Sequence, residues 1–585
     1  MPNFRRFAPP EPRHGWRHSA RGARRALSPR GAFALHEVDG AVVFALRAAL
    51  ATGVVAVPLS VAGRPDLAVY ATLGSLTTTF GRNLPYARRV RVLSVAALAM
   101  TAAVGTGSAL AVAADPHAGG AGALAVIAAT AVVAGIAKFV CDVTRVGGLG
   151  AVLLLFAFAV AANGAPAAAD VLPYTGLAAA GAGCAWVLGV AGVLLHPDRP
   201  QRLAVAMALR RVADLLDVTG GAATAGGAAT RSVRHRATVA VLHAYYCLGV
   251  PPPTRAPRAV PGGQADFVRL TDLAWSLLTG SGGGPAAAAG PVARGLRAQA
   301  RLLTGRRRRV PPILDPLRSR SGAPEPHLPE DPGATRATEL LLGRPGGRER
   351  FAAAAVPAWR MALGTGAAGA VAALLGLEHG YWAAISAAAV LHSVNVRTTA
   401  QRAVQRTLGT GVGLLLALAV LGLHLAPVTL TLVVVVLEFL LEYVAARNYA
   451  LAVVFLTPIA LLLTELAVPA PAGELVLDRV LGSVVGIGVG LLCALLIVHD
   501  RAAVRVERAL AECRSAVADA ERALTGPPGP LLPVLQVRLA LAVVELREAD
   551  DTAAGELWPA GIDPTELAAT EGRAYALLGR LRHPR

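Results

Sequence analysis

The chain has 585 residues, of which 54% are hydrophobic and only 16% are charged, and its formal net charge is +19. Soluble domains carry about 25% charged residues, so the composition excludes an ordinary soluble globular protein. The apolar residues gather in blocks of about 17 to 24 residues, the length of an α-helix that crosses a hydrocarbon core of about 30 Å. We therefore predict an all-α membrane protein.

Twelve apolar blocks are predicted to be transmembrane helices, in two similar halves of six. The first half covers 41–196, with helices at 41–63, 66–81, 92–114, 119–139, 146–163 and 173–196. The second half covers 351–498, with helices at 353–376, 379–395, 407–424, 426–445, 448–467 and 479–498.

Three polar segments surround these halves. Residues 1–40 are rich in arginine and are predicted to be a disordered cytoplasmic tail. Each half is followed by a predicted cytoplasmic helical region, at 197–350 with a Pro/Gly/Arg-rich linker and at 499–585. The central region contains helical patterns at 200–217, 229–249 and within 264–305, and the C-terminal region at 501–524, 532–549 and 564–581.

The charges of the short loops predict the orientation. Arg82, Arg88 and Arg89 follow the second block, and Arg397 and Arg402 follow the eighth, whereas the alternate loops carry mostly acids or histidine. Positive loops face the cytoplasm, so both termini and the central region are predicted to be cytoplasmic. The regular alternation also supports the count of about twelve spans.

The two halves share a spacing of arginines. Arg47 and Arg91 are 44 residues apart in the first half, and Arg360 and Arg406 are 46 apart in the second. Because six spans is an even number, the halves are predicted to be parallel repeats, which are known in transporters.

The second half resembles the fusaric-acid-resistance (FUSC-like) membrane proteins. The resemblance rests on Arg360, Glu378–Ala384, Gln405–Gly411, Arg447-Asn448-Tyr449, Thr457-Pro458, Asp478-Arg479 and Gly482. It is strong over 351–500 and weaker over 40–200. It implies a bacterial inner-membrane (plasma-membrane) protein of the aromatic acid exporter group, with two six-helix halves each followed by a cytoplasmic helical domain. Plant malate-type anion channels are similar single-half proteins that pair as dimers.

Arginines within spans are the leading candidates for an anion path. A charge at a helix centre costs roughly 2.5–3.5 kcal/mol on insertion scales and often has a role, and the guanidinium fork suits a carboxylate. Arg47 and Arg360 occupy equivalent places and could form a cationic path, or extend to the cytoplasmic headgroups. Arg91 and Arg406, at the starts of the third and ninth spans, are further candidates for which the headgroup interpretation is favoured.

Other polar groups lie in the second half. Glu438 and Glu442 share one helix face four residues apart, and they could relay protons or pair with Arg360 or Arg406. Alternatively, Glu442 lies at the membrane interface and Glu438 is a structural ion-pair partner. Asn448, Tyr449, Thr457 and Pro458 are polar or helix-bending positions in the eleventh span, and either pack or line a cavity. Gly482, Gly486 and Gly490 form a stripe of small residues that favours close helix packing.

Motifs for catalysis are missing from the sequence, which has no GxSxG, HExxH or phosphate-loop pattern and no cysteine spacing for a metal. We therefore predict no enzyme activity, no metal and no cofactor. The basic run Arg306–Arg309 next to a membrane indicates anionic lipid rather than nucleic acid. The predicted partners are the lipid bilayer and a small organic anion, and a homo-oligomer stays open.

The predicted function is a membrane transporter that exports small organic acids. The duplicated body and its arginines support transport, while the choice of aromatic carboxylic acids as cargo comes from the resemblance. A passive anion channel and a membrane scaffold whose cytoplasmic helices bind partners are the alternatives.

Overall fold

The computed structural model describes residues 40–582, except for short segments at 83, 145–149, 165, 221–226, 255–263, 281–288, 306–311, 319–331, 344–347, 394, 446, 468–470, 497–500, 527–530 and 556–561. The predicted N-terminal tail and the basic run Arg306–Arg309 lie outside the described residues. The described residues form helices and no strands, as the composition predicted.

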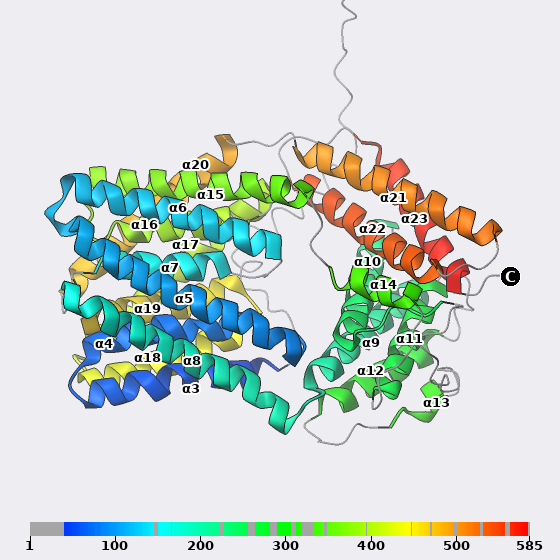
Figure 1. The fold of residues 1–585 in the computed structure, drawn as a ribbon, viewed down its shortest axis with the longest axis horizontal. Helices are drawn as coiled ribbons and strands as arrows, with labels where there is room; N and C mark the ends of the chain where they lie inside the picture. Colours follow the sequence, from blue (N-terminus) through cyan, green and yellow to red (C-terminus); the bar gives the residue numbers. More distant parts are fainter. Residues whose placement is uncertain are drawn as a thin grey trace, which may run out of the picture.

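The helices form two bodies side by side (Figure 1). The larger one, here called the membrane body, contains two sets of six helices. The first half is α3 (Ala41–Val61), α4 (Pro65–Ser75), α5 (Tyr86–Ala114), α6 (Gly120–Thr144), α7 (Gly150–Ala162) and α8 (Val171–Leu195). The second half is α15 (Arg348–Leu374), α16 (Tyr381–Leu391), α17 (Val396–Leu421), α18 (Pro427–Ala445), α19 (Tyr449–Ala467) and α20 (Ala472–Leu496).

Eight of the described helices are long and apolar enough to cross a membrane: α3, α5, α6, α8, α17, α18, α19 and α20. Large apolar side chains such as Leu98, Leu374 and Leu415 are exposed on the outside of the body, where lipid would cover them. The chain is therefore a multi-pass helical membrane protein.

The other four predicted spans are helices of a different kind. Helices α4, α7 and α16 have 11, 13 and 11 residues, which is about 17–20 Å at 1.5 Å per residue. This is too short to cross a core of about 30 Å alone. Helix α15 has 27 residues but is not among the eight. Twelve full crossings thus stay a prediction.

The short helices are buried in the centre of the body. Every residue of α16 from Trp382 to Leu391 is buried. Glycine brings α20 against α16, because a Cβ at Gly486 would lie 2.2 Å from the carbonyl oxygen of Ala383. Gly482 and Gly490 also face α16. The predicted role of this small-residue stripe in close helix packing is confirmed.

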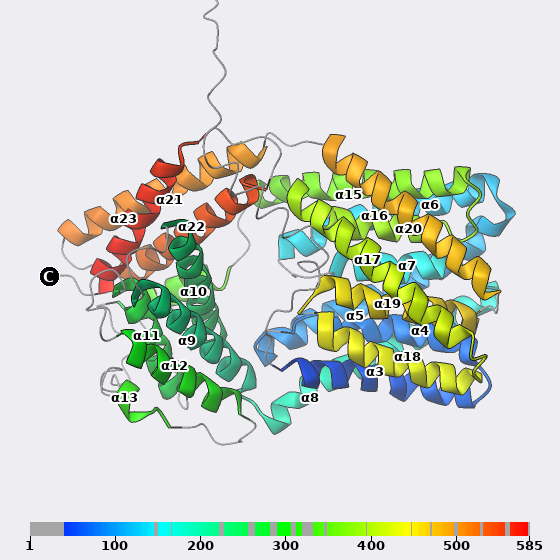
Figure 2. The ribbon, with the colours of Figure 1, turned by 180° about the vertical axis from the view of Figure 1, so that it is seen from behind.

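The two halves interlock. Helix α6 packs against α15, and α18 packs against α3. Nearer the centre, α7 contacts α16 and α4 contacts α19. A hydrogen bond of 2.7 Å joins the hydroxyls of Ser60 and Thr431 across the α3–α18 contact. The first helix of each half therefore lies at an outer edge of the body, α3 at the lower edge and α15 at the upper edge in both views (Figures 1 and 2).

The smaller body, here called the appended domain, combines the central and C-terminal regions of the chain. It contains α9 (Arg199–Gly220), α10 (Gly227–Leu248), α11 (Ala265–Gly280), α12 (Ala289–Thr304), α13 (Asp315–Arg318), α14 (Pro332–Leu341), α21 (Arg501–Thr525), α22 (Leu532–Ala553) and α23 (Pro564–Arg582). One hydrophobic core includes Trp275 of α11 and Cys513 of α21. The hydroxyls of Thr238 and Tyr575 lie 2.8 Å apart within it. Two regions far apart in sequence thus share one core.

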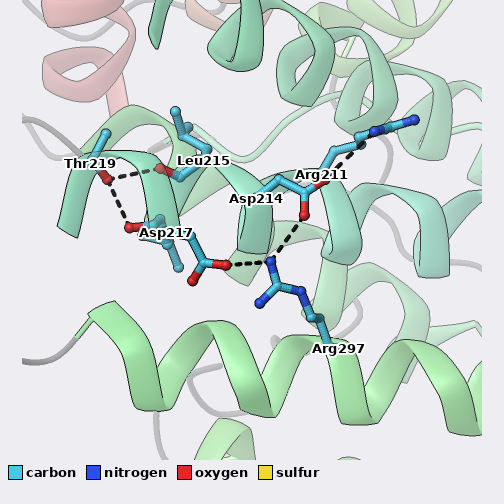
Figure 3. Close-up of polar contacts among 7 residues, drawn as sticks. Arg211, Asp214, Leu215, Asp217, Thr219 and Arg297 are labelled. Carbon is cyan, nitrogen blue, oxygen red and sulfur yellow. Dashed lines mark hydrogen bonds and ion pairs between the residues drawn. The ribbon is translucent and has the colours of Figure 1, made fainter. Parts of the chain in front are cut away.

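Ion pairs on the outside of this domain connect its helices. Arg297 of α12 contacts Asp214 at 3.0 Å and Asp217 at 2.5 Å, both on α9 (Figure 3). A third of the Arg297 side chain is exposed, and such pairs contribute only about 0–1 kcal/mol. The shared apolar core is therefore the main source of the stability of the domain.

Because the core is shared, we expect a destabilising substitution in the central region to loosen the packing of the C-terminal region as well. We expect Trp275→Ala to destabilise the domain by about 3–5 kcal/mol, because it leaves a large cavity. The thiol of Cys513, which is fully buried, should then react faster with a maleimide, as measured by mass spectrometry. Arg297→Gln is the control and should change this rate little. Unchanged labelling of Cys513 in Trp275→Ala would show that the two regions have separate cores.

Candidate functional site

Two arginines are buried inside the second half of the membrane body. Arg406 of α17 is 2% exposed, and Arg479 of α20 is 1% exposed. Nη1 of Arg406 donates to the hydroxyl oxygen of Tyr449 at 3.2 Å, and Nη2 donates to Oγ of Ser386 at 3.2 Å. The Arg479 guanidinium lies 4.0 Å from the ring centre of Trp382. The two positive charges are close enough to repel each other.

The pair retains unused donors. Among the described residues, Nε of both arginines and Nη1 of Arg479 are buried without a hydrogen-bond partner. Neither guanidinium has a carboxylate within ion-pair distance in the described part of the chain. Asp478, the neighbour of Arg479, contacts Nδ1 of His379 at 2.8 Å instead. We call Arg406, Arg479, Tyr449, Ser386 and Trp382 the arginine site.

Aromatic rings border the arginine site. The ring centre of Trp382 lies 4.8 Å from that of Tyr381 and 6.0 Å from that of Phe156 on α7. On the other side, the guanidinium of Arg402 lies over the ring of Tyr449 at 5.1 Å. The site therefore combines positive charge with flat apolar surface, at the contact between α16 and the first half.

The predicted pairing of Arg47 with Arg360 in one anion path is wrong. Their helices, α3 and α15, lie at opposite edges of the membrane body, because each packs on the fourth helix of the other half (Figure 2). Arg360 donates from Nη2 to the carbonyl oxygens of Leu391 at 3.4 Å and Ser393 at 2.8 Å, at the end of α16. Arg47 lines a separate pocket near the appended domain.

Arg91 and Arg406 lie in different surroundings. Arg91 is exposed on α5, in agreement with its predicted position near the headgroups. The same prediction is wrong for Arg406, which is buried. Helix α17 begins at Val396 rather than at 407, so Arg406 lies almost three turns inside the helix. Hydropathy alone placed the helix start too late because Arg397, Arg402 and Arg406 interrupt the apolar pattern.

Of the alternatives for the acids on α18, pairing with Arg360 or Arg406 is wrong. Glu442 forms an ion pair with Arg82, from the turn before α5, and accepts a hydrogen bond of 2.8 Å from Oγ1 of Thr79. Glu438 is buried without a hydrogen-bond partner among the described residues. The positive charge of Arg82 is close enough to attract its carboxylate. Arg360 and Arg406 are not the partners, because α18 packs against α3 of the other half. The proton relay stays a prediction.

The polar positions of α19 support the arginine site from one side. Oδ1 of Asn448 accepts from the backbone N–H of Leu451 at 3.1 Å, which satisfies a free donor at the start of the helix. Tyr449 follows and reaches Arg406. Thr457 and Pro458 are buried, and Thr457 faces Gly413 of α17. These two residues therefore pack rather than line the arginine site.

Sequence reasoning missed Arg479, Trp382 and Ser386 as site residues. A signal for Arg479 was available, because it lies beside a loop that the charge pattern assigns to the face with few positive charges. An arginine on that face is not explained by the charge pattern of the loops and therefore indicates a specific role for this side chain. A further cluster nearby joins Glu378, His379 and Asp478, whose ligand atoms lie within 4.8 Å of one another.

The ion pair between the halves predicts that Arg82 and Glu442 are strongly coupled in their contributions to stability. We expect Glu442→Gln to lower the apparent unfolding temperature in detergent sharply, because removing one partner of a buried pair costs about 3–5 kcal/mol. The double variant Arg82→Gln/Glu442→Gln should recover much of this loss. Glu474→Gln, at an exposed acid of α20, should have little effect. Additive losses in the double variant would contradict the pairing.

Comparison with known proteins agrees with this architecture. Residues 367–493 match the family model described as "Fusaric acid resistance protein-like". This range includes all five residues of the arginine site. The chain is similar to "Uncharacterized membrane protein YvaC" of Bacillus subtilis (strain 168), with 34% identity over 229 residues, which are 37% of this chain. The match spans 34% of that relative's length. No solved structure matches the chain. Residues 367–493 of the second half are therefore similar to the fusaric acid resistance-like family.

Proposed function

We propose that this chain is a membrane transporter that exports small organic anions, and that the arginine site binds the carboxylate of the cargo. The observation that carries the proposal is the burial of Arg406 and Arg479 together, without a carboxylate partner among the described residues. An ionised group buried without a counter-charge is costly. Two such groups of the same sign at one place favour a site that an anion completes.

The free donors fit a carboxylate. Arg406 keeps Nε, and Arg479 keeps Nε and Nη1, so the two fork-shaped groups can each donate to a planar anion. Ser386 and Tyr449 hold the Arg406 guanidinium in place before the cargo arrives. The binding energy is then not spent on ordering a long side chain.

The surrounding rings favour an aromatic acid within this class. Trp382 already accepts one cation on its face, and Tyr381 and Phe156 extend the flat apolar surface. An aromatic carboxylate would place its charge on the arginines and its ring against these side chains. The family match supports transport or efflux, and the aromatic cargo is our proposal from the site.

We also propose that the twelve helices of the membrane body are two parallel six-helix repeats. The second and sixth helices of each half approach through a glycine in the same way. A Cβ at Gly181 would lie 2.0 Å from the carbonyl oxygen of Ala71, and a Cβ at Gly486 would lie 2.2 Å from that of Ala383. The two contacts provide a register between the halves.

This register relates the arginine site to the first half. Tyr174 and Arg479 each lie seven residues before their glycine, and Tyr70 and Trp382 each lie one residue before the alanine. Tyr70 and Tyr174 stack with ring centres 3.8 Å apart, and the Arg479 guanidinium lies over the ring of Trp382 at 4.0 Å. The common stacking supports the repeat, and only the second half has a cation there.

The proposed setting is the inner (plasma) membrane, with the bilayer as partner and both termini and the appended domain on the cytoplasmic side. All the residues of the arginine site come from one chain, so cargo binding does not require a homo-oligomer. We propose that the cargo crosses without a chemical change, so the protein is not an enzyme.

Transport of benzoate into proteoliposomes tests the arginine site. We expect Arg479→Gln and Arg406→Gln each to lower the initial rate tenfold or more, because a hydrogen bond to a charged group contributes about 1.5–3 kcal/mol. Arg91→Gln changes an exposed arginine of the same membrane body and should transport normally. Tryptophan fluorescence and size-exclusion chromatography check that each variant is folded.

Three outcomes would change the proposal. Normal benzoate uptake by the double variant Arg406→Gln/Arg479→Gln would remove these residues from the mechanism. Equal rates for acetate and benzoate would remove the aromatic class while keeping a carboxylate carrier. Current under voltage, without an ion gradient, would replace the exporter with a passive anion channel.

A further inference from the structure

A second group of arginines lies where the membrane body meets the appended domain. A pocket of about 210 Å³ is formed there by α3, the turn before α5, α5 itself, α9 and α10. Its basic lining residues are Arg47, Arg82, Arg89, Arg199 and His243. No carboxylate is among the described residues that line it. The pocket is separate from the arginine site, which α16, α17, α19 and α20 form.

Two arginines of this junction pocket, Arg47 and Arg89, have no balancing charge among the described residues. Arg82 is paired with Glu442, which approaches from α18. In the described part of the chain, neither Arg47 nor Arg89 has a carboxylate within ion-pair distance. Burial lowers the pKa of His243, so its imidazole is neutral near pH 7. The positive charge that a ligand meets therefore comes from the arginines.

The guanidinium groups are held in place around one ring. The charged ends of Arg47, Arg82 and Arg89 lie 5.9, 5.9 and 5.7 Å from the ring centre of Phe44. Arg89 also donates to the carbonyl oxygens of Gly81 at 3.0 Å and Arg82 at 2.5 Å. Glu442 offsets the charge of Arg82, so Arg47 and Arg89 are the like charges left near one another, and an anion between them would relieve their repulsion.

We propose that the junction pocket binds a phosphate group. A phosphate offers several acceptor oxygens in different directions, which suits guanidinium groups that approach from more than one helix. A single planar carboxylate would use fewer of them. The volume admits a phosphate with a small organic substituent. The phosphate can belong to an anionic lipid headgroup or to a free phosphate compound.

The position of the pocket gives the ligand a structural effect. Arg47 and Arg89 belong to the membrane body, whereas Arg199 and His243 belong to the appended domain. A bound phosphate therefore contacts both bodies and holds them together. The stacking of Arg88 on Tyr246, at 4.4 Å, already joins α5 to α10 beside the pocket. Occupancy should stabilise this contact, because a ligand that binds only the assembled form shifts the equilibrium towards it.

Binding of inorganic phosphate to the full-length protein in a neutral detergent tests the proposal. We expect a saturable signal by isothermal titration calorimetry at constant ionic strength. Arg47→Gln and Arg199→Gln should each weaken Kd tenfold or more, because each removes one charged donor. Arg91→Gln removes an exposed arginine from α5 outside the pocket and should leave Kd unchanged. The benzoate site is distinguished by Arg479→Gln, which should leave phosphate binding intact.

A second arm identifies the source of the phosphate. The thermal stability of the protein is compared in nanodiscs of phosphatidylcholine and of phosphatidylcholine with phosphatidylglycerol. Stabilisation by phosphatidylglycerol that Arg47→Gln abolishes supports a lipid headgroup. Calorimetric binding without this lipid effect supports a free phosphate compound. The proposal is overturned if inorganic phosphate gives no more heat than chloride and both nanodiscs give the same stability in wild type and in Arg47→Gln.

Discussion

Burial of guanidinium charge among apolar helices is the constraint on which the rest of the membrane body depends. Arg406 and Arg479 have no counter-charge among the described residues, yet the helices around them are closely packed. Such an arrangement persists only where neighbouring groups fix the charges by hydrogen bonds and ring contacts. Ser386, Tyr449 and Trp382 have this role. The helices that carry them cannot slide or rotate without releasing an arginine.

The shortness of α16 follows from the same constraint. A helix of 11 residues ends inside the body and leaves carbonyl oxygens without helical partners. Arg360 supplies a donor to this end, so its charge stabilises backbone instead of forming an anion path. At the other end of α16, glycines of α20 allow the approach that places Arg479 against Trp382. Arg360 thus stabilises the end of α16, and Arg479 packs against Trp382 at its start.

The sequence predicted the helices well because hydropathy reports local composition. The predicted 448–467 is observed at Tyr449–Ala467, and 532–549 at Leu532–Ala553. The site was harder to predict, for two reasons. A hydropathy pattern ends an apolar block at an arginine, so it places Arg406 and Arg479 at the starts of their helices rather than inside them. Which helices meet is decided by packing between the halves, and no local pattern predicts that Glu442 pairs with Arg82 or that the central and C-terminal regions share a core.

The difference between the proposed repeats bears on how many anions one chain can hold. In the first half, Tyr174 occupies the place of Arg479, and its ring stacks on Tyr70 without charge. Because a stacked phenol pair needs no anion to complete it, the first half has no equivalent reason to bind cargo. Arg47, which is half-buried, and Arg89, which is buried, lie instead at the end near the appended domain, around Phe44. The membrane body therefore has one proposed anion site deep in the second half and another at the junction of the first. The two proposed repeats differ in this way, with a site for cargo in one and a site that joins the two bodies in the other.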